Sequence, residues 1–285
     1  MIRAGHPFPS VLNALAAGAI AFLAGGAGEP AAGPALRLGA AMLAIQLSIG
    51  AVNDLVDVDL DRGRKPGKPL AHGGVHPRAV AALAVAGLVI GLSLAEVSGA
   101  PVAGIAVVGA ALGYLYDLRL SRTALSWLPL ALALPLVPIY GWLGATGSIP
   151  VALWSLVPVG AVAGLGLALG NGLADFDRDA SAGVATAAIR LGRRLAWRVQ
   201  ALALGGVVLA AVVFAPPPSR EDSVLSLAWI VGLKGGSIAV LAGAGLTGPA
   251  GPERAALRER GWELQAVGVA LVGLAWLLGI ANPSG

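Results

Sequence analysis

The sequence predicts an all-α, polytopic membrane protein whose nine transmembrane helices form a bundle with an internal parallel repeat. Of the 285 residues, 57% are hydrophobic and only 12% are charged, whereas an ordinary soluble domain carries about 25% charged residues. The apolar residues gather in runs of roughly 20, the length that crosses the hydrocarbon core of a bilayer. A polar motif that occurs twice, each time directly after such a run, indicates the repeat.

Nine apolar segments have the length of a membrane span. They cover approximately residues 9–27, 34–52, 77–96, 101–117, 126–146, 151–172, 195–215, 223–246 and 262–281. If the N-terminus lies in the cytoplasm, Arg37 and Arg220 fall on the outer side of the membrane and Lys234 falls within a span. All the other Lys and Arg residues, of 19 in the chain, fall on the cytoplasmic side. This bias follows the positive-inside rule, so the net charge of +4 indicates orientation and not nucleic-acid binding. A signal peptide is the alternative for the first segment, because Arg3 precedes it and small residues follow it.

The motif NDLVDVDLD at residues 53–61 follows the second span and reappears as NGLADFDRD at residues 171–179, after the sixth. At an offset of 118 residues, five of the nine positions are identical. Two matching motifs that end inward-running spans, four spans apart, are typical of a parallel repeat related by an axis along the membrane normal.

Within each motif an amide and two carboxylates recur every four residues, which places them on one face of a helix. They are Asn53, Asp57 and Asp61 in the first motif and Asn171, Asp175 and Asp179 in the second. Asp54 stands beside the first face, whereas Asp59 and Asp177 point roughly the opposite way. Because a helix C-terminus is already negative, acids there indicate bound cations, although a solvated acidic helix end is the alternative. Oxygen ligands without any Cys suit Mg²⁺ ions in facing clusters, bridged by a diphosphate.

Basic residues accompany both motifs, and Lys and Arg neutralise phosphate oxygens. They are Arg64, Lys65 and Lys68 after the first motif and Arg178 and Arg190 in and after the second. Each of them alone is equally well explained as a cytoplasmic anchor of a span.

These motifs resemble those of the UbiA superfamily of intramembrane prenyltransferases. Residues 53–61 match its first signature, NDxxDxxxD, and residues 175–179 match its second, DxxxD. KPGKPLAHGGV at residues 65–75 is similar to the family's RPxRPxxxGxV, with Lys in both Arg positions, and YLYDLRL at residues 114–120 is similar to its Y-x-x-x-L-K/R loop.

The segment after the second motif, with Gly183, Thr186 and the LG pair at 191–192, also resembles the family. Two features depart from it. Gly172 stands where some relatives carry an acid, and Lys in place of Arg loses bidentate phosphate geometry.

The resemblance implies that residues 1–285 form a single integral-membrane prenyltransferase domain. A polyprenyl diphosphate of geranylgeranyl type or longer would ionise to an allylic carbocation, and a lipophilic acceptor with an aromatic ring or hydroxyl would capture it. Mg²⁺ would be the cofactor, held by the carboxylates and amides of both motifs. Lys65, Lys68, Tyr114 and Arg119 would act at the reacting diphosphate, and Arg64, Arg178 and Arg190 would bind substrate.

We expect a prokaryotic plasma-membrane enzyme surrounded by lipid. The distribution of Lys and Arg predicts that its active site and its N-terminus face the cytoplasm. Nothing in the sequence indicates a nucleic-acid partner or an obligate protein partner.

Lys234 lies in the middle of a span, where an ionisable group is costly and is by default a functional candidate. We expect it to bind an acidic group of a substrate; pairing within the bundle or snorkelling to the interface are the alternatives.

Two other functions are alternatives that the same motifs and spans would also fit. A terpene cyclase would quench the carbocation internally and need no acceptor. A transporter of lipid diphosphates or divalent cations would also combine repeats with intramembrane charge, but here the acids lie at one rim and not near the midplane.

Overall fold

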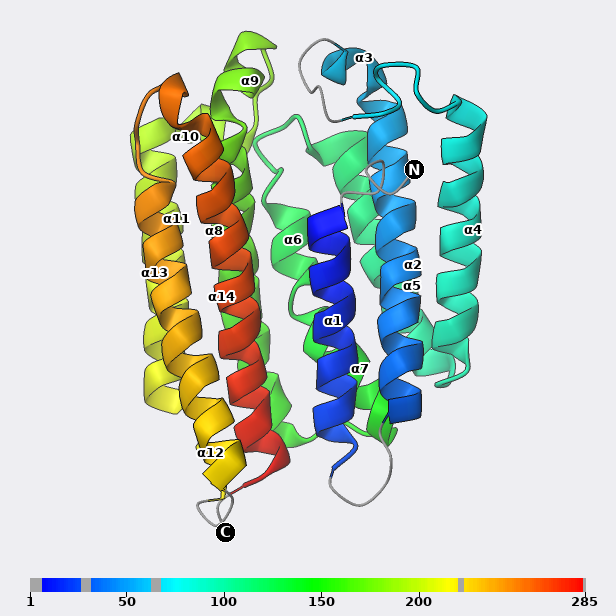
Figure 1. The fold of residues 1–285 in the computed structure, drawn as a ribbon, viewed down its shortest axis with the longest axis vertical. Coiled ribbons are helices and arrows are strands. Elements are labelled where there is room, and N and C mark those ends of the chain that lie inside the picture. Colours follow the sequence, from blue (N-terminus) through cyan, green and yellow to red (C-terminus); the bar gives the residue numbers. More distant parts are fainter. Residues whose placement is uncertain (1–6, 27–31, 63–67, 220–222, 284–285) are drawn as a thin grey trace. The chain divides into compact units, whose positions relative to one another are not determined.

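The computed structural model describes residues 7–26, 32–62, 68–219 and 223–283, which are almost wholly helical (Figure 1). Within these ranges the only β-type pairing is an isolated bridge between Pro218 and Pro283. Nine helical segments of the described chain are long and apolar enough to cross a membrane. The predicted fold class is therefore confirmed, and the protein is an integral membrane protein.

The helices of the described ranges have the following bounds: α1 Pro7–Ala24, α2 Ala32–Val56, α3 Val58–Asp61, α4 Pro77–Glu96, α5 Ala100–Leu115, η2 Tyr116–Leu120, α6 Leu128–Ala133, α7 Leu136–Thr146, η3 Val151–Ser155, α8 Leu156–Ala174, α9 Phe176–Ser181, α10 Ala187–Leu191, α11 Arg193–Phe214, α12 Ser223–Ile230, η4 Val231–Gly235, α13 Gly236–Leu246, η5 Pro252–Arg254 and α14 Ala255–Ala281. Of these, η2 and η4 are π-helical, and η3 and η5 are 3₁₀-helical.

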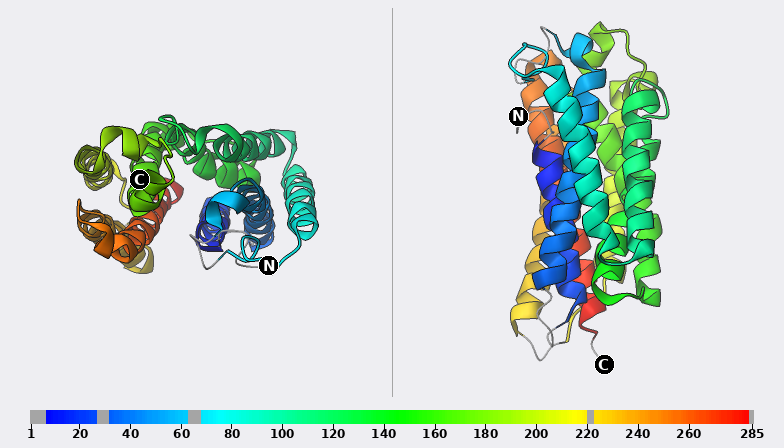
Figure 2. Two further views of the ribbon diagram at one scale, coloured as in Figure 1. Left: turned by 90° about the horizontal axis from the view of Figure 1, so that it is seen from above. Right: turned by 90° about the vertical axis from the view of Figure 1, so that its right-hand side faces the viewer.

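The chain forms two compact units, and the fifth span is divided between them. The first unit comprises Met1–Ser121 and Leu136–Ile149, and the second comprises Arg122–Pro135 and Pro150–Gly285. The division falls at Pro135, which lacks an N–H and interrupts a helix. As a result α6 packs on α8 in the second unit, and α7 packs on α1 in the first. Figure 2 shows the ribbon from two further directions.

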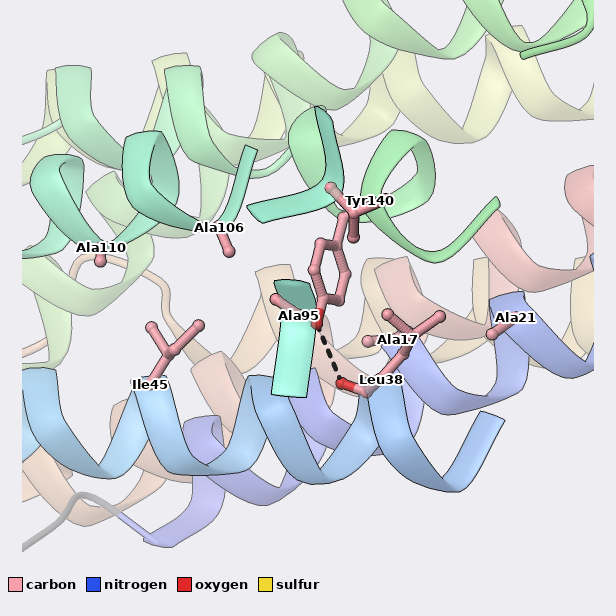
Figure 3. Packing of buried hydrophobic residues seen from close by; sticks show 9 residues of the cluster. Ala17, Ala21, Leu38, Ile45, Ala95, Ala106, Ala110 and Tyr140 are labelled. Carbon is pink, nitrogen blue, oxygen red and sulfur yellow. Dashed lines mark hydrogen bonds between the residues drawn. The ribbon is translucent and has the colours of Figure 1, made fainter. Parts of the chain in front are cut away.

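In the first unit, α2 packs against both α1 and α4, and α1 also packs against α7. The first span is thus part of the helix packing, which favours a structural helix over a signal peptide. Figure 3 shows the buried cluster of this unit, in which the Tyr140 hydroxyl donates to the Leu38 carbonyl oxygen at 3.4 Å. Most of its members are alanines, as expected where membrane helices approach closely.

Glycine sets the separation of α2 and α4. A Cβ at Gly87 would lie 2.6 Å from the Ala44 carbonyl oxygen, and one at Gly91 would lie 2.9 Å from that of Ala41. Both contacts are with backbone, which cannot move aside as a flexible side chain can.

We expect Gly87→Ala to lower the free energy of unfolding by about 1–3 kcal/mol, because the added methyl overpacks this interface. Gly109→Ala on α5 is the matched control, since nothing lies within 4 Å of a Cβ there; it should be neutral or stabilising by up to about 1 kcal/mol. Thermal unfolding in detergent measures both. Equal effects of the two substitutions would contradict this account of the α2–α4 packing.

In the second unit, α8 packs against α6, α11 and α14, and α13 packs along α14. Three buried polar side chains join these helices. The Gln200 Nε2 donates to Gln265 Oε1 at 2.6 Å, and the Thr247 hydroxyl donates to Gln200 Oε1 at 3.1 Å. Each polar group thereby finds a partner within the apolar unit, which buried amides require.

The internal repeat is visible in the backbone of both motifs. α2 ends at Val56 and α8 ends at Ala174, and the offset between these ends is the 118 residues found in the sequence. A short helix begins two residues later in each case, and the residue between the helices is Asp57 or Asp175.

Candidate functional site

The first motif occupies the end of α2 and the whole of α3. Asp57 lies between them with φ −97° and ψ 5°, a sparsely populated conformation that is common among active-site residues. Its N–H donates to the Asn53 carbonyl oxygen at 2.9 Å, and the Asp61 N–H donates to that of Asp57 at 2.8 Å. The motif was expected to lie on one helix, and this is wrong in detail, because the helix is broken at Asp57. Its four-residue spacing is kept by these two hydrogen bonds.

The second motif has the same backbone. Asp175 has φ −90° and ψ 0°, its N–H donates to the Asn171 carbonyl oxygen at 3.1 Å, and the Asp179 N–H donates to that of Asp175 at 2.9 Å. The side chains of all three are partly buried. Each motif thus presents an amide and two carboxylates one helical turn apart.

Lys68 lies against the carboxylates of the first motif. Its ammonium pairs with Asp54, and its Nζ lies 3.9 Å from Asp61 Oδ2. Asp54 and Asp61 are only 2% and 3% exposed, so this cation compensates buried negative charge. Arg64 and Lys65, the other basic residues expected here, lie outside the described residues.

Asp117 joins the first motif from a different helix, and it was not predicted from the sequence. The Asn53 Nδ2 donates to Asp117 Oδ1 at 3.0 Å and lies 3.4 Å from Asp57 Oδ2. Asp117 is 4% exposed, on η2 at the end of the fourth span. An ionisable residue in a span is a functional candidate by default, so the signal was present within YLYDLRL.

Tyr114 and Arg119 flank Asp117 in sequence but differ in surroundings. The Tyr114 hydroxyl lies 2.7 Å from the Ser48 hydroxyl, within hydrogen-bond distance, and Ser48 also donates to the Ala84 carbonyl oxygen. Tyr114 is thus tied to α2 near the first motif, whereas Arg119 is exposed.

The basic residues of the second motif also differ from one another. Arg178 of α9 forms an ion pair with Asp175, the residue just before that helix, whereas Arg190 is exposed on α10. The structure therefore places Arg178 with the expected metal-binding residues and leaves Arg190 at the surface.

Asp59 and Asp177 lie off the shared face, as their spacing predicts. Asp59 is exposed and pairs with Arg62 at 3.3 Å. Asp177 instead accepts 2.5 Å hydrogen bonds from Arg193 and from Arg258. We call Asp177, Arg193 and Arg258 the Asp177 ion-pair cluster.

Arg258 is the centre of that cluster and was not identified from the sequence. It is 0% exposed. Its Nε donates to the Leu173 carbonyl oxygen at 3.0 Å, and its Nη1 donates to those of Ala250 and Gly251 at 3.0 and 2.9 Å. One guanidinium on α14 therefore fixes the end of α8, the start of α9 and the loop before α14, which holds the second motif in place.

The turn after the second motif explains two residues that follow it. Gly183 has φ +68°, a conformation that favours glycine, and it lets the Val184 N–H reach the Asp179 carbonyl oxygen at 2.9 Å. Thr186 then caps α10, with its hydroxyl accepting from the Ile189 N–H at 3.4 Å.

Lys234 lies on the π-helical turn η4, in the middle of the eighth span, and is exposed. π-Helical turns inside α-helices are frequent at functional sites.

The donor set of the motifs suits a hard cation. In the described part of the chain, no three His, Asp or Glu side chains come close enough together to hold a metal by themselves. Mg²⁺ usually binds through one or two carboxylates and completes its shell with water and substrate phosphates. The buried Asp117 Oδ2, which has no hydrogen-bond partner among the described residues, fits such a cation.

Comparison with known proteins finds a family and relatives for this chain. The model of the UbiA prenyltransferase family matches residues 13–233. Digeranylgeranylglyceryl phosphate synthase of Methanopyrus kandleri is 28% identical over 204 residues, which are 69% of this chain and 73% of that protein.

Two solved structures share the fold. An apo UbiA homologue from Aeropyrum pernix K1 has a TM-score of 0.73 at 18% identity, covering 98% of this chain and 100% of that one. A UbiA homologue from Archaeoglobus fulgidus bound to GPP and Mg²⁺ has a TM-score of 0.69 at 16% identity, covering 96% and 98% of the two chains.

Proposed function

The chain belongs to the UbiA prenyltransferase family, and from this premise we propose the reaction that it catalyses. It transfers a polyprenyl group, of geranylgeranyl type or longer, from an isoprenoid diphosphate to a hydroxyl or aromatic acceptor in the membrane. The allylic C–O bond ionises, the diphosphate leaves with the bonding electron pair, and the acceptor captures the allylic carbocation with loss of a proton.

One observation carries this proposal. Two carboxylate motifs, 118 residues apart, share the same broken-helix backbone at Asp57 and Asp175. Acids at a helix C-terminus oppose the helix dipole, and a cation-binding role accounts for such an arrangement in both copies.

Mg²⁺ is the cofactor in this proposal. When bound, it neutralises the charge that develops on the leaving diphosphate. The residues that would hold it are Asn53, Asp54, Asp57 and Asp61 in the first motif and Asn171, Asp175 and Asp179 in the second.

Basic residues of the chain also compensate negative charge at the site. Lys68 offsets part of the negative charge of Asp54 and Asp61, which lowers their repulsion of an anionic substrate. Arg119, Arg178 and Arg190, with Arg64 and Lys65, stabilise negative charge on the diphosphate. Tyr114, tied to Ser48 of α2, positions the end of the fourth span beside the first motif.

A hydroxyl acceptor of the glycerol phosphate type is the leading candidate. The Methanopyrus kandleri relative is named for a digeranylgeranylglyceryl phosphate product. The archaeal homologue bound to GPP and Mg²⁺ supports an isoprenoid diphosphate as donor and Mg²⁺ as the metal, by analogy of fold. The acidic motifs face the cytoplasm in this proposal, because most Lys and Arg accompany them.

Lys234 then binds the anionic headgroup of the acceptor. We expect Lys234→Met to raise the KM for a phosphate-bearing acceptor by about tenfold, since a single charge-assisted contact contributes about 1.5 kcal/mol. The KM for the prenyl diphosphate should stay unchanged, and Lys234→Arg should restore most of the loss. Steady-state kinetics with each substrate varied in turn measure this. A rise in the donor KM alone would contradict the assignment.

The reaction is tested with purified protein in nanodiscs. Geranylgeranyl diphosphate is incubated with glyceryl phosphate lipids, other hydroxyl acceptors and aromatic acceptors, and products are identified by mass spectrometry. A prenylated acceptor is expected, with the glyceryl phosphate lipid preferred. Hydrocarbon products formed equally well without any acceptor would indicate a cyclase, and intact diphosphate with every donor length would contradict the proposal.

A further inference from the structure

Asp117 is a buried acid that neither motif contains. It lies on η2, the π-helical turn that follows α5 and packs on α2. Asp117 is only 4% exposed. It lies near the end of the membrane-spanning segment Ala100–Leu120. A buried ionisable group in such a place is costly and is therefore a functional candidate by default.

The two carboxylate oxygens of Asp117 have different surroundings. Oδ1 accepts a hydrogen bond from Asn53 Nδ2 at 3.0 Å, and this same nitrogen lies 3.4 Å from Asp57 Oδ2. Oδ2 is buried and accepts no hydrogen bond from the described residues. A buried carboxylate oxygen without a donor is disfavoured and requires an explanation such as a bound cation.

Neighbouring charges strengthen this requirement. Asp57 and Asp54 carry like charges that oppose the charge of Asp117, and Lys68 carries the charge that favours it. Lys68 is already engaged with Asp54 and Asp61. A divalent cation offsets repulsion among neighbouring carboxylates, as in other metal sites.

We infer that Asp117 contributes a further carboxylate to the divalent-cation site of the first motif, beside Asn53 and Asp57. This inference rests on the proposed function, because the Mg²⁺ site is part of it. A role limited to orienting Asn53 would need only Oδ1, and an asparagine would serve equally well. A cation would account for the buried second oxygen of Asp117, which has no hydrogen-bond partner among the described residues.

Asp117→Asn tests the inference, because it keeps an oxygen acceptor for Asn53 and removes the charge. Mn²⁺ is the probe, titrated by electron paramagnetic resonance into the protein in nanodiscs without substrate. We expect the Mn²⁺ affinity to weaken about tenfold or more. Asp59→Asn is the matched control, since it removes the same charge from an exposed position of the same motif, and should leave the affinity unchanged.

A second readout separates this role from a structural one. In EDTA, Asp117→Asn should unfold at the same or a higher temperature than the wild type, because it relieves a buried charge. A lower unfolding temperature in EDTA, or wild-type Mn²⁺ affinity, would overturn the inference. If affinity falls in Asp57→Asn but not in Asp117→Asn, the proposed metal site stands without Asp117. If the wild type binds no Mn²⁺, both proposals fail.

Discussion

Asp57→Ala and Asp175→Ala are each expected to reduce Mg²⁺-dependent prenyl transfer by at least about 10²–10³-fold. Each removes a carboxylate from the residue that joins the two helices of a motif, and loss of one electrostatic contact to a developing charge has effects of this size. The protein should still insert and fold, because the backbone hydrogen bonds at these positions do not need the side chain. Initial rates with geranylgeranyl diphosphate measure the effect.

Asp59→Ala is the control for both, because Asp59 lies in the first motif but is exposed and faces away from the shared side. It should retain activity within about twofold, as surface substitutions usually do. Activity retained in both Asp57→Ala and Asp175→Ala would rule out the motifs as the metal-binding elements.

Arg258→Met is expected to lower the free energy of unfolding by about 3–5 kcal/mol, the usual cost of removing one partner of a buried ion pair. The substitution keeps much of the side-chain volume. It leaves Arg193 as the remaining cation beside Asp177 in the described part of the chain. It also removes a donor from the carbonyl oxygens of Leu173, Ala250 and Gly251. Thermal unfolding in detergent should show this loss of stability. Activity should also fall, because α9, which carries part of the second motif, loses its contact with Arg258.

Arg260→Met provides the comparison two residues away. The Arg260 side chain is 77% exposed, and Glu263, at 2.8 Å, is its one ion-pair partner among the described residues. Its removal should therefore change stability by less than about 0.5 kcal/mol. Similar losses for Arg258→Met and Arg260→Met would show that the Asp177 ion-pair cluster does not hold the second motif.

Hydropathy was sufficient to find the spans, because apolar length is what a bilayer requires. The ends were less well predicted where polar residues remain helical. The second span was expected at residues 34–52, but α2 continues to Val56 because the motif itself forms its last turn. The division of the fifth span at Pro135 between two units could not be predicted, since it depends on which helix each half packs against.

For the site, the spacing of residues within each motif could be interpreted from the sequence, whereas contacts between distant segments could not. The shared face of Asn53, Asp57 and Asp61 follows from helical periodicity. Asp117 lies 64 residues from Asn53, and Arg258 lies 81 residues from Asp177. No periodic signal links residues so far apart in one sequence, so both contacts appear only once the helices are packed.

The most direct measurement is product formation by the purified wild-type protein after treatment with EDTA, followed by addition of Mg²⁺. Geranylgeranyl diphosphate and a glyceryl phosphate lipid serve as substrates, and the prenylated lipid is quantified by mass spectrometry. The proposed function predicts no product in EDTA and full recovery with Mg²⁺. Undiminished product in EDTA, or none after Mg²⁺ is restored with donors of any length, would contradict it.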